Sequence, residues 1–184
     1  MQRTGLGSLL IAGAFSFAAL RAPAQTPPRM KAGLWQIHVE REENGAKMPD
    51  ASERMKDRMK NMTPERRKQF EEMMKQRGVE SGAGGVIKLC YSQKMVEHGA
   101  WADQGVCKTD YSNRSATFWK WHSNCPELHY QGDGEASFPD PENFVVKSSG
   151  VSTNGGKTVA SKLTRTGKWL SADCGDLKPM DSQQ

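Results

Sequence analysis

Four cysteines restrict the possible folds of this chain more than any other feature. They stand at positions 90, 107, 125 and 174 and form no Cys-x-x-Cys pair. The spacing therefore matches neither a zinc ribbon nor a thioredoxin-type redox site, and two disulfides are the expected state. Three connectivities are possible. We favour Cys90–Cys107 with Cys125–Cys174, because local closure ties first the middle of the domain and then its end.

The N-terminus has the pattern of a secretory signal peptide. Arg3 gives a basic start, residues 6–20 are apolar, and Ala22-Pro23-Ala24 is a small-x-small cleavage site. We expect residues 1–24 to be removed on export, since an uncleaved anchor needs a longer apolar stretch. No later stretch is apolar enough to span a membrane, and export would place the cysteines in an oxidising compartment.

The charge pattern argues against nucleic acid as a partner. Loss of residues 1–24 removes two arginines and no acid, which lowers the formal net charge from +5 to +3. Basic and acidic residues are mixed in the most charged segment, residues 50–75, as on a solvated helix. A phosphate-binding surface would instead cluster its positive charges.

Most of the chain shows the alternation of half-buried antiparallel strands. In Gly33–Glu40, the residues Trp35, Ile37 and Val39 fall on one face and polar residues on the other. Further strands are predicted at residues 86–91, 106–111, 115–125, 127–138, 143–149, 157–165 and 168–172, with turns at 112–114, 139–141 and 154–156. A short helix over residues 92–98, capped by Ser92, interrupts the series.

Residues 50–78 form a helical insertion, since they contain strong helix formers and lack the period of two. The second of its two helices has clear boundaries, with Thr63 as N-cap, Pro64 at the first position and Gly78 past the end. Methionines recur at helical spacing along both helices. The insertion is therefore a Met-rich pair of helices.

These patterns predict one mainly β (α+β) domain over residues 31–179. We expect a curved antiparallel sheet or a small barrel-like meander with the Met-rich two-helix insertion and two disulfides. Residues 25–30 are predicted to be a disordered leader and residues 180–184 a disordered tail. The expected core residues are Trp35, Trp119, Trp121 and Phe144.

No stretch of the chain matches a catalytic or cofactor-binding motif, so we predict a protein that is not an enzyme and has no cofactor. Asp133 and Glu135 share one face of a strand, where charges at alternate positions usually mark the solvent side. His122 and His129 lie on successive predicted strands and could approach across a hairpin as metal ligands. Isolated histidines on polar strand faces are more often surface residues.

The methionines of the insertion are candidate ligands for a soft metal. Cu(I) prefers thioether sulfur, and the candidates are Met55, Met59, Met62, Met73 and Met74. A methionine stripe at helical spacing also serves as adaptable packing surface against the sheet or a partner. This second interpretation is favoured here.

Several motifs in order resemble the bacterial exported family called domain of unknown function 3617. They are Gly-Leu-Trp-Gln at 33–36, Thr-Pro-Glu-Arg-Arg at 63–67, Met73-Met74, Cys90-Tyr-Ser-Gln, the later Cys107 and Cys125, and Ala-Asp-Cys-Gly-Asp at 172–176. The resemblance implies a protein of the periplasm of a Gram-negative bacterium. It supplies no catalytic residues, and it agrees with the disulfide pairing that we favour.

We therefore hypothesise an exported envelope protein that acts as a non-catalytic binding or interaction module. Its partner would be another envelope protein or an apolar small molecule enclosed by the aromatic-lined sheet, with the helical insertion as a lid. Soft-metal binding through the methionines is the alternative.

Overall fold

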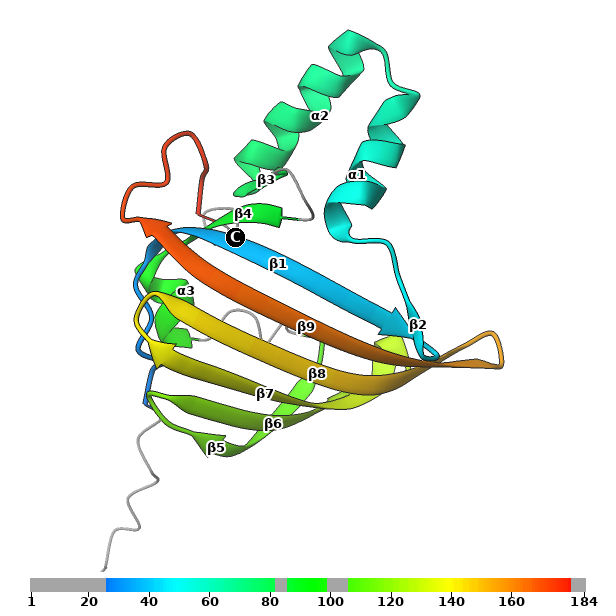
Figure 1. Ribbon diagram of the computed structural model, residues 1–184. Coiled ribbons are helices and arrows are strands. Elements are labelled where there is room, and N and C mark those ends of the chain that lie inside the picture. The colour runs from blue at the N-terminus through cyan, green and yellow to red at the C-terminus, as the bar shows by residue number, and fades with distance from the viewer. Residues whose placement is uncertain (1–25, 82–85, 99–105, 180–184) are drawn as a thin grey trace, which may run out of the picture.

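The computed structural model describes residues 26–81, 86–98 and 106–179 of the 184-residue chain (Figure 1). The predicted signal peptide, residue 25 of the predicted leader and the predicted tail at 180–184 lie outside the described residues. The elements are β1 (Gly33–Glu43), β2 (Ala46–Lys47), α1 (Ala51–Lys60), α2 (Pro64–Gln76), β3 (Val79–Ser81), β4 (Val86–Tyr91), α3 (Gln93–His98), β5 (Lys108–Arg114), β6 (Phe118–Cys125), the 3-10 turn η1 (Pro126–Leu128), β7 (Tyr130–Asp140), β8 (Asn143–Asn154) and β9 (Lys157–Ser171).

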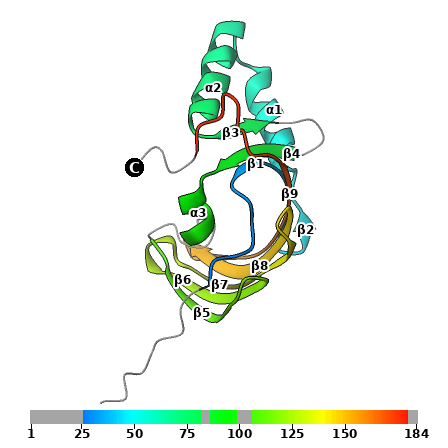
Figure 2. The same ribbon diagram turned by 90° about the vertical axis from the view of Figure 1, so that its left-hand side faces the viewer.

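The described strands form one curved antiparallel sheet of nine strands. Their order is β3-β4-β1-β9-β8-β7-β6-β5, with β2 beside β1. The sheet wraps around an interior, as the view in Figure 2 shows, and stays open because β3 and β5 at its two ends are not paired with each other in the described residues. The mainly β fold with a curved antiparallel sheet is thus confirmed.

Tight turns with the expected chemistry join neighbouring strands. Asn44 and Gly45, with φ of 49° and 80°, connect β1 to β2, and Gly155 and Gly156, with φ of 55° and 78°, connect β8 to β9. Two-residue hairpins of type I′ need positive φ at both central positions, where glycine and asparagine are tolerated best. The Gly155-Gly156 turn fixes the register of the long β8–β9 pair, which runs from Asn143↔Lys168 to Asn154↔Lys157.

The core fills one end of the interior. Trp35 and Trp119 are 0% exposed, and Trp121 and Phe144 are 7% and 3% exposed. The ring centroids of Trp35 and Phe144 lie 5.2 Å apart. The four predicted core residues are therefore confirmed.

Residues 28–30 are packed against the sheet, although we predicted them to be part of a disordered leader. Met30 is 8% exposed within the core. Arg29 donates its backbone N–H to the Ala116 carbonyl at 2.9 Å and its Nε–H to the Phe138 carbonyl at 2.8 Å. The sequence pattern gave no sign of this order, because the contacts are made with strands about a hundred residues away.

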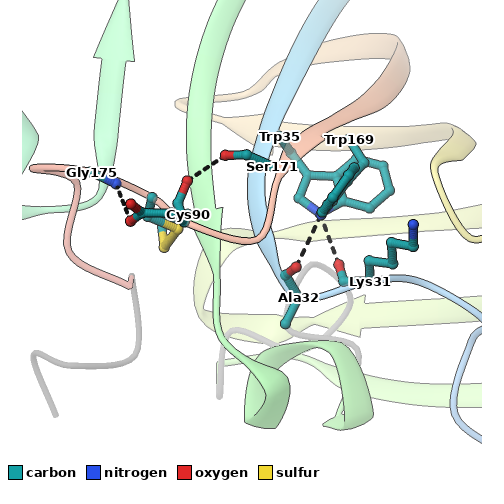
Figure 3. The surroundings of a disulfide bond; sticks show 9 residues. Lys31, Ala32, Trp35, Cys90, Trp169, Ser171 and Gly175 are labelled. Atoms are coloured by element: carbon teal, nitrogen blue, oxygen red, sulfur yellow. Dashed lines mark hydrogen bonds between the residues drawn. A yellow bond between two sulfur atoms is a disulfide. The ribbon is translucent and has the colours of Figure 1, made fainter.

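Two tryptophans hold the chain just before β1. The Trp35 indole donates to the Lys31 carbonyl and the Trp169 indole donates to the Ala32 carbonyl, each at 3.0 Å (Figure 3). In Figure 2 this blue segment crosses the near end of the curved sheet. Residues 28–32 therefore close the end of the interior that the aromatic core fills.

The helical insertion lies where the sequence predicts it and stands away from the sheet as an arm (Figure 1). Asp50 caps α1 in a capping box with Glu53, and Thr63 caps α2 ahead of Pro64. Asp50 and Thr63 each accept a hydrogen bond from the backbone N–H three residues on, which satisfies a group that the helix leaves free. Helix α2 has no buried residue.

Helix α3 packs inward instead. Its Met95 and Val96 are 6% and 2% exposed and belong to the core cluster, and Ser92 caps it as predicted by accepting from the Met95 N–H at 3.1 Å. Figure 2 shows α3 beside the gap between the two ends of the sheet.

The disulfide pairing that we favoured is wrong. Cys90 bonds to Cys174 and Cys107 bonds to Cys125, with Cα–Cα distances of 5.7 and 4.1 Å. The favoured pairing assumed closure along the chain, whereas the observed bonds join neighbours in space.

Sheet order explains both bonds. Lys108 lies opposite Asn124, so the preceding Cys107 meets Cys125 across the β5–β6 pair. The chain after β9 turns past β1 to β4, where Cys174 meets Cys90 (Figure 3). In this turn Asp173 accepts the Gly175 N–H at 2.9 Å on its carboxylate and the Ser171 hydroxyl on its carbonyl.

Candidate functional site

The inner face of the sheet changes character along the strands. Next to the aromatic core lies a row in which Val39, Arg165 and Val146 stand opposite one another on β1, β9 and β8. Beyond it the inward positions are small or hydroxylated. They include Ser148 opposite Gly134, and Gly132 opposite both Ser123 and Gly150. The interior is thus filled at one end and contains small side chains at the other.

A cavity of about 150 Å³ lies at this second end. Its lining comes from β6, β7, β8 and β9, together with the Cys107–Cys125 disulfide. The lining residues are Cys107, Trp121, Ser123, Cys125, Tyr130, Gly132, Asp133, Val146, Ser148, Leu163 and Arg165. The set combines apolar walls, three hydroxyl groups and one guanidinium group.

Arg165 is the cation of this cavity. Its side chain is half-buried, and alternation along β9 puts it on the same face as Leu163 and Gly167. No carboxylate pairs with it among residues 26–81, 86–98 and 106–179. The inward-facing acid nearest in register, Glu43 on β1, is instead 2.6 Å from Arg41.

Tyr91 is a second sign that Arg165 faces the interior. Burial raises the pKa of the Tyr91 phenol to about 12, and the positive charge of Arg165 acts in the opposite direction. Tyr91 lies on β4 and is 7% exposed in the core cluster. The two side chains are therefore close enough to interact electrostatically although they come from different parts of the sheet.

Two hydroxyl groups of the cavity have defined environments. Ser123 is 9% exposed, and its hydroxyl lies 3.1 Å from that of Thr109 on the neighbouring strand. The Tyr130 ring lies across two glycines, since a Cβ at Gly132 or Gly150 would come within 2.4 Å of its oxygen. Burial, followed by the nearby Asp133 carboxylate, raises the pKa of Tyr130, so it keeps its proton at neutral pH.

The wall of the cavity depends on another glycine. A Cβ at Gly134 would approach within 2.3 Å of the Trp121 ring. The indole therefore lies flat against the backbone of β7, and its 7% exposure places it at the border between core and cavity.

Arg165 and the cavity were not predicted from the sequence. The strand predicted for residues 157–165 ended at this arginine, and arginine is a surface residue in most contexts. One signal was present in the alternation, because Arg165 follows Leu163 by two positions and so shares its face. That spacing gave no information about the length of β9 or about its neighbours.

The structure brings together three of the five copper candidates. Met55 and Met59 on α1 and Met74 on α2 line one cleft of about 190 Å³, together with Phe70 and strand β3. Met62 and Met73 do not line it, and Met73 is 40% exposed. The cleft lies between the two helices and the edge strand β3, and the core-lined inner face of the sheet takes no part in it.

The two candidate histidines lie apart. The His122 Nδ1 is 3.0 Å from the Asp133 carboxylate on the exposed outer face of the sheet. His129 follows η1, has φ of 47° and lines a different depression. No group of three or more histidine, cysteine or acidic residues fit to hold a metal ion occurs in the described part of the chain.

The outer face carries the carboxylates that the sequence singled out. Asp133 lies between His122 and Ser149 in register, and Glu135 lies between Lys120 and Lys147. Charges of opposite sign thus face each other across strands, as on a solvated antiparallel surface. Ser149 stands beside the aspartate and not beside the histidine, so these three residues lack the order of a nucleophile–base pair.

One comparison with known proteins identifies a family. A family model described as "Protein of unknown function (DUF3617)" matches residues 30–174. A protein of Pseudomonas putida described as "Uncharacterized protein in lpd-3 5'region" is 27% identical over 123 residues, which are 65% of this chain and 84% of that protein. No solved structure matches the chain. None of the described helices is long and apolar enough to cross a membrane. Because the model covers most of the chain and the predicted resemblance is thereby confirmed, the protein belongs to the DUF3617 family of proteins of unknown function.

Proposed function

We propose that this protein is an exported, non-enzymatic binding module whose ligand site is the cavity inside the curved sheet. One observation carries the proposal. The inner face has a solid aromatic core at one end and, at the other, a cavity of about 150 Å³ lined by small, hydroxylated and apolar side chains with one arginine. A concave, mostly apolar site with a few convergent polar groups is typical of small-molecule binding.

Two features support an exported protein. The apolar stretch at residues 6–20 is followed by a signal-peptidase-like site in the sequence. The cysteines form two disulfides, a state that persists in oxidising compartments. The envelope of a Gram-negative bacterium provides such a compartment in the periplasm.

The outer face supports a role without catalysis. Asp133 and Glu135 lie opposite positive or polar side chains at the exposed surface, where water screens them. Arginine offers N–H donors and no acceptor, so Arg165, which faces the cavity, is suited to binding and not to proton abstraction.

The aromatic residues do not form a ligand site of their own. Trp35, Trp119 and Phe138 are each 0% exposed and contact other rings, so they fill the interior themselves. The arm stands beyond β3 and β4 and does not cover the inner face as a lid (Figures 1 and 2). The ligand site that we propose is the neighbouring, polar end of the same interior.

A cavity-filling pair of variants tests the proposal. Ser148→Leu adds bulk inside the cavity, whereas Ser149→Leu makes the same change one residue away on the outer face. Benzoate and benzyl alcohol are the probes, and binding is followed by saturation-transfer NMR and by tryptophan fluorescence, which reports on Trp121. We expect the wild type and Ser149→Leu to bind a probe and Ser148→Leu to lose it.

Near-ultraviolet circular dichroism controls for the fold, and Ser148→Val gives a smaller filling if the leucine is not accommodated. Equal binding by the inner and outer variants, or no binding of either probe to the wild type, would overturn the proposal.

The arm gives a second candidate function, soft-metal binding, on a separate observation. Met55, Met59 and Met74 line one cleft, and several thioethers together suit Cu(I). Replacing these three by leucine keeps the apolar packing and removes the sulfur. A Cu(I) titration against a chromogenic chelator should show the site lost in this variant and kept in Met62→Leu with Met73→Leu. Identical titrations would assign the cleft to packing alone.

A further inference from the structure

The proposed ligand site contains a specific recognition element, and the inference drawn from it rests on the function proposed above. We infer that the ligand is a small monocarboxylate with an apolar body, whose carboxylate pairs with the Arg165 guanidinium. Two observations on Arg165 support this ligand. Arg165 has no carboxylate partner in the described chain, and it lies in a cavity between hydroxyl groups and apolar walls.

The charge of Arg165 favours an anionic ligand. A charged side chain that is partly removed from water loses hydration, and proteins normally compensate this with a partner of opposite sign. Arg165 lies in register between Val39 and Val146, and neither valine can offer an acceptor from its side chain. An anionic ligand would supply the missing partner, so occupancy of the cavity by an anion is favoured over occupancy by a neutral molecule.

The number of cationic side chains in the cavity indicates how many charges the ligand carries. Arg165 is the one cationic side chain among the residues that line the cavity. The lining also includes Asp133, but its carboxylate contacts His122 on the outer face, so Asp133 adds no second positive charge inside the cavity. A monoanion is therefore favoured over a phosphate that carries two charges.

The hydrogen-bond donors of the cavity match the shape of a carboxylate. A guanidinium group presents parallel N–H donors that match the two oxygens of a carboxylate. The hydroxyls of Ser148, Ser123 and Tyr130 lie in the same cavity and can donate further hydrogen bonds to these oxygens. Tyr130 keeps its proton and so remains a donor.

The walls and the volume of the cavity limit the rest of the ligand. Trp121, Val146 and Leu163 give the cavity apolar walls. At about 150 Å³ it is well below the roughly 300–1,000 Å³ of sites for drug-sized ligands. The body of the ligand is therefore small and apolar, on the scale of a single ring or a short branched chain.

Three probes and two variants test the inference. Benzoate is the planar monoanion, benzyl alcohol the neutral analogue and inorganic phosphate the tetrahedral anion. Arg165→Met removes the charge and keeps an unbranched chain. Arg165→Lys keeps the charge but lacks the parallel N–H donors of the guanidinium group. Lys162→Met is the matched control, because it removes a positive charge from the outer face of the same strand.

We expect wild type and Lys162→Met to bind benzoate more tightly than benzyl alcohol or phosphate. Arg165→Met should weaken benzoate by about tenfold or more, as expected for loss of a charge-assisted hydrogen bond, and leave benzyl alcohol within about twofold. Arg165→Lys should bind benzoate with intermediate affinity, since one point charge remains.

The outcomes separate this inference from the proposed function. Equal binding of benzoate and benzyl alcohol, both lost in Ser148→Leu, would keep the cavity as a ligand site and overturn the inference that the ligand carries a carboxylate. Tighter binding of phosphate than of benzoate would overturn the inference that the ligand is a monoanion. Benzoate binding that Arg165→Met does not change would overturn the role of this arginine.

Discussion

Single glycines decide where the large aromatic rings lie on the inner face. A Cβ at Gly167 would stand 2.1 Å from the Phe144 ring, and one at Gly134 would stand 2.3 Å from the Trp121 ring. Both glycines sit in the middle of long strands, where their usual effect is to weaken the strand. Here they make room for rings that the core and the cavity wall require.

Gly167→Ala should therefore destabilise the protein. The added methyl group meets the Phe144 ring and forces it out of its position, and overpacking of this kind costs typically about 1–3 kcal/mol. The measurement is the free energy of unfolding in urea. Lys168→Ala, at the next and exposed position, is the control and should change it little. Equal stability of wild type and Gly167→Ala would contradict the packing described here.

Tyr91 predicts a loss of stability at alkaline pH. Its pKa is raised from 10.0 to about 12, mainly by burial, so the folded state keeps the phenolic proton after the unfolded state has lost it. The stability is complete below a pH of about 10 and falls as the pH rises from about 10 to about 12. The sign follows from the unfolded state, which binds fewer protons than the folded state in that window.

Tyr91→Phe removes this contribution. Between pH values of about 9 and 11 the wild type should lose about 1 kcal/mol more unfolding free energy than the variant. Denaturant midpoints at the two pH values measure the difference, and tyrosinate absorbance shows when the phenol ionises. A variant that loses as much stability as the wild type would show that Tyr91 does not titrate as described.

At the scale of elements, local signals predicted the helices well. The caps Thr63 and Ser92 act where the sequence placed them, because a cap depends on residues three positions away and on nothing more distant. The structure adds Asp50 as the cap of α1. The boundaries of the helical insertion at residues 50–78 were predictable for the same reason.

Strand ends were less predictable, and the β5–β6 turn shows why. The sequence suggested a turn at residues 112–114, which would place Cys107 opposite Trp119. The strands actually end at Arg114 and begin again at Phe118, which places Tyr111 opposite Trp121 and Cys107 opposite Cys125. A shift of three residues in one turn therefore concealed the correct disulfide. The bulge between Tyr111 and Asn113 resembles a turn in sequence terms.

Strand β9 shows the same limit. The sequence suggested two strands with a break at Thr166-Gly167, yet β9 runs unbroken over Lys157–Ser171. The glycine that looked like a turn is explained by the Phe144 ring, which comes from a different strand. Continuity placed Arg165 in the middle of the sheet, and for that reason the cavity was not visible in the sequence.

The arm should respond to cap removal without the sheet. Asp50 accepts the Glu53 N–H at 2.8 Å, and Asp50→Ala removes a cap worth about 1 kcal/mol. We expect amide hydrogen exchange in α1 to speed up by about fivefold while amides in β8 and β9 keep their rates. Lys56→Ala, at an exposed position within α1, is the control. Faster exchange across the whole sheet would show that the arm and the sheet unfold together.

At the scale of the whole molecule, the two disulfides join different segments of the chain. Cys107–Cys125 staples the edge strand β5 to its neighbour and closes a separation of 18 residues. Cys90–Cys174 ties the segment after β9 to β4 and closes a separation of 84 residues. The second bond therefore joins parts of the sheet that are distant along the chain.

This difference predicts unequal losses of stability. By the chain-entropy account, removal of Cys90–Cys174 by paired alanine substitution should cost about 4.5 kcal/mol, and removal of Cys107–Cys125 should cost about 3 kcal/mol. Urea unfolding of the two variants measures both, and peptide mapping under non-reducing conditions first verifies the two bonds in the wild type. A third variant, with Cys90 and Cys107 both replaced by alanine, separates the pairings. With the observed pairing it leaves Cys125 and Cys174 without their partners, whereas closure along the chain would retain a disulfide between them. A larger loss for the short loop would contradict the view that Cys90–Cys174 holds the closing segment of the molecule to its sheet.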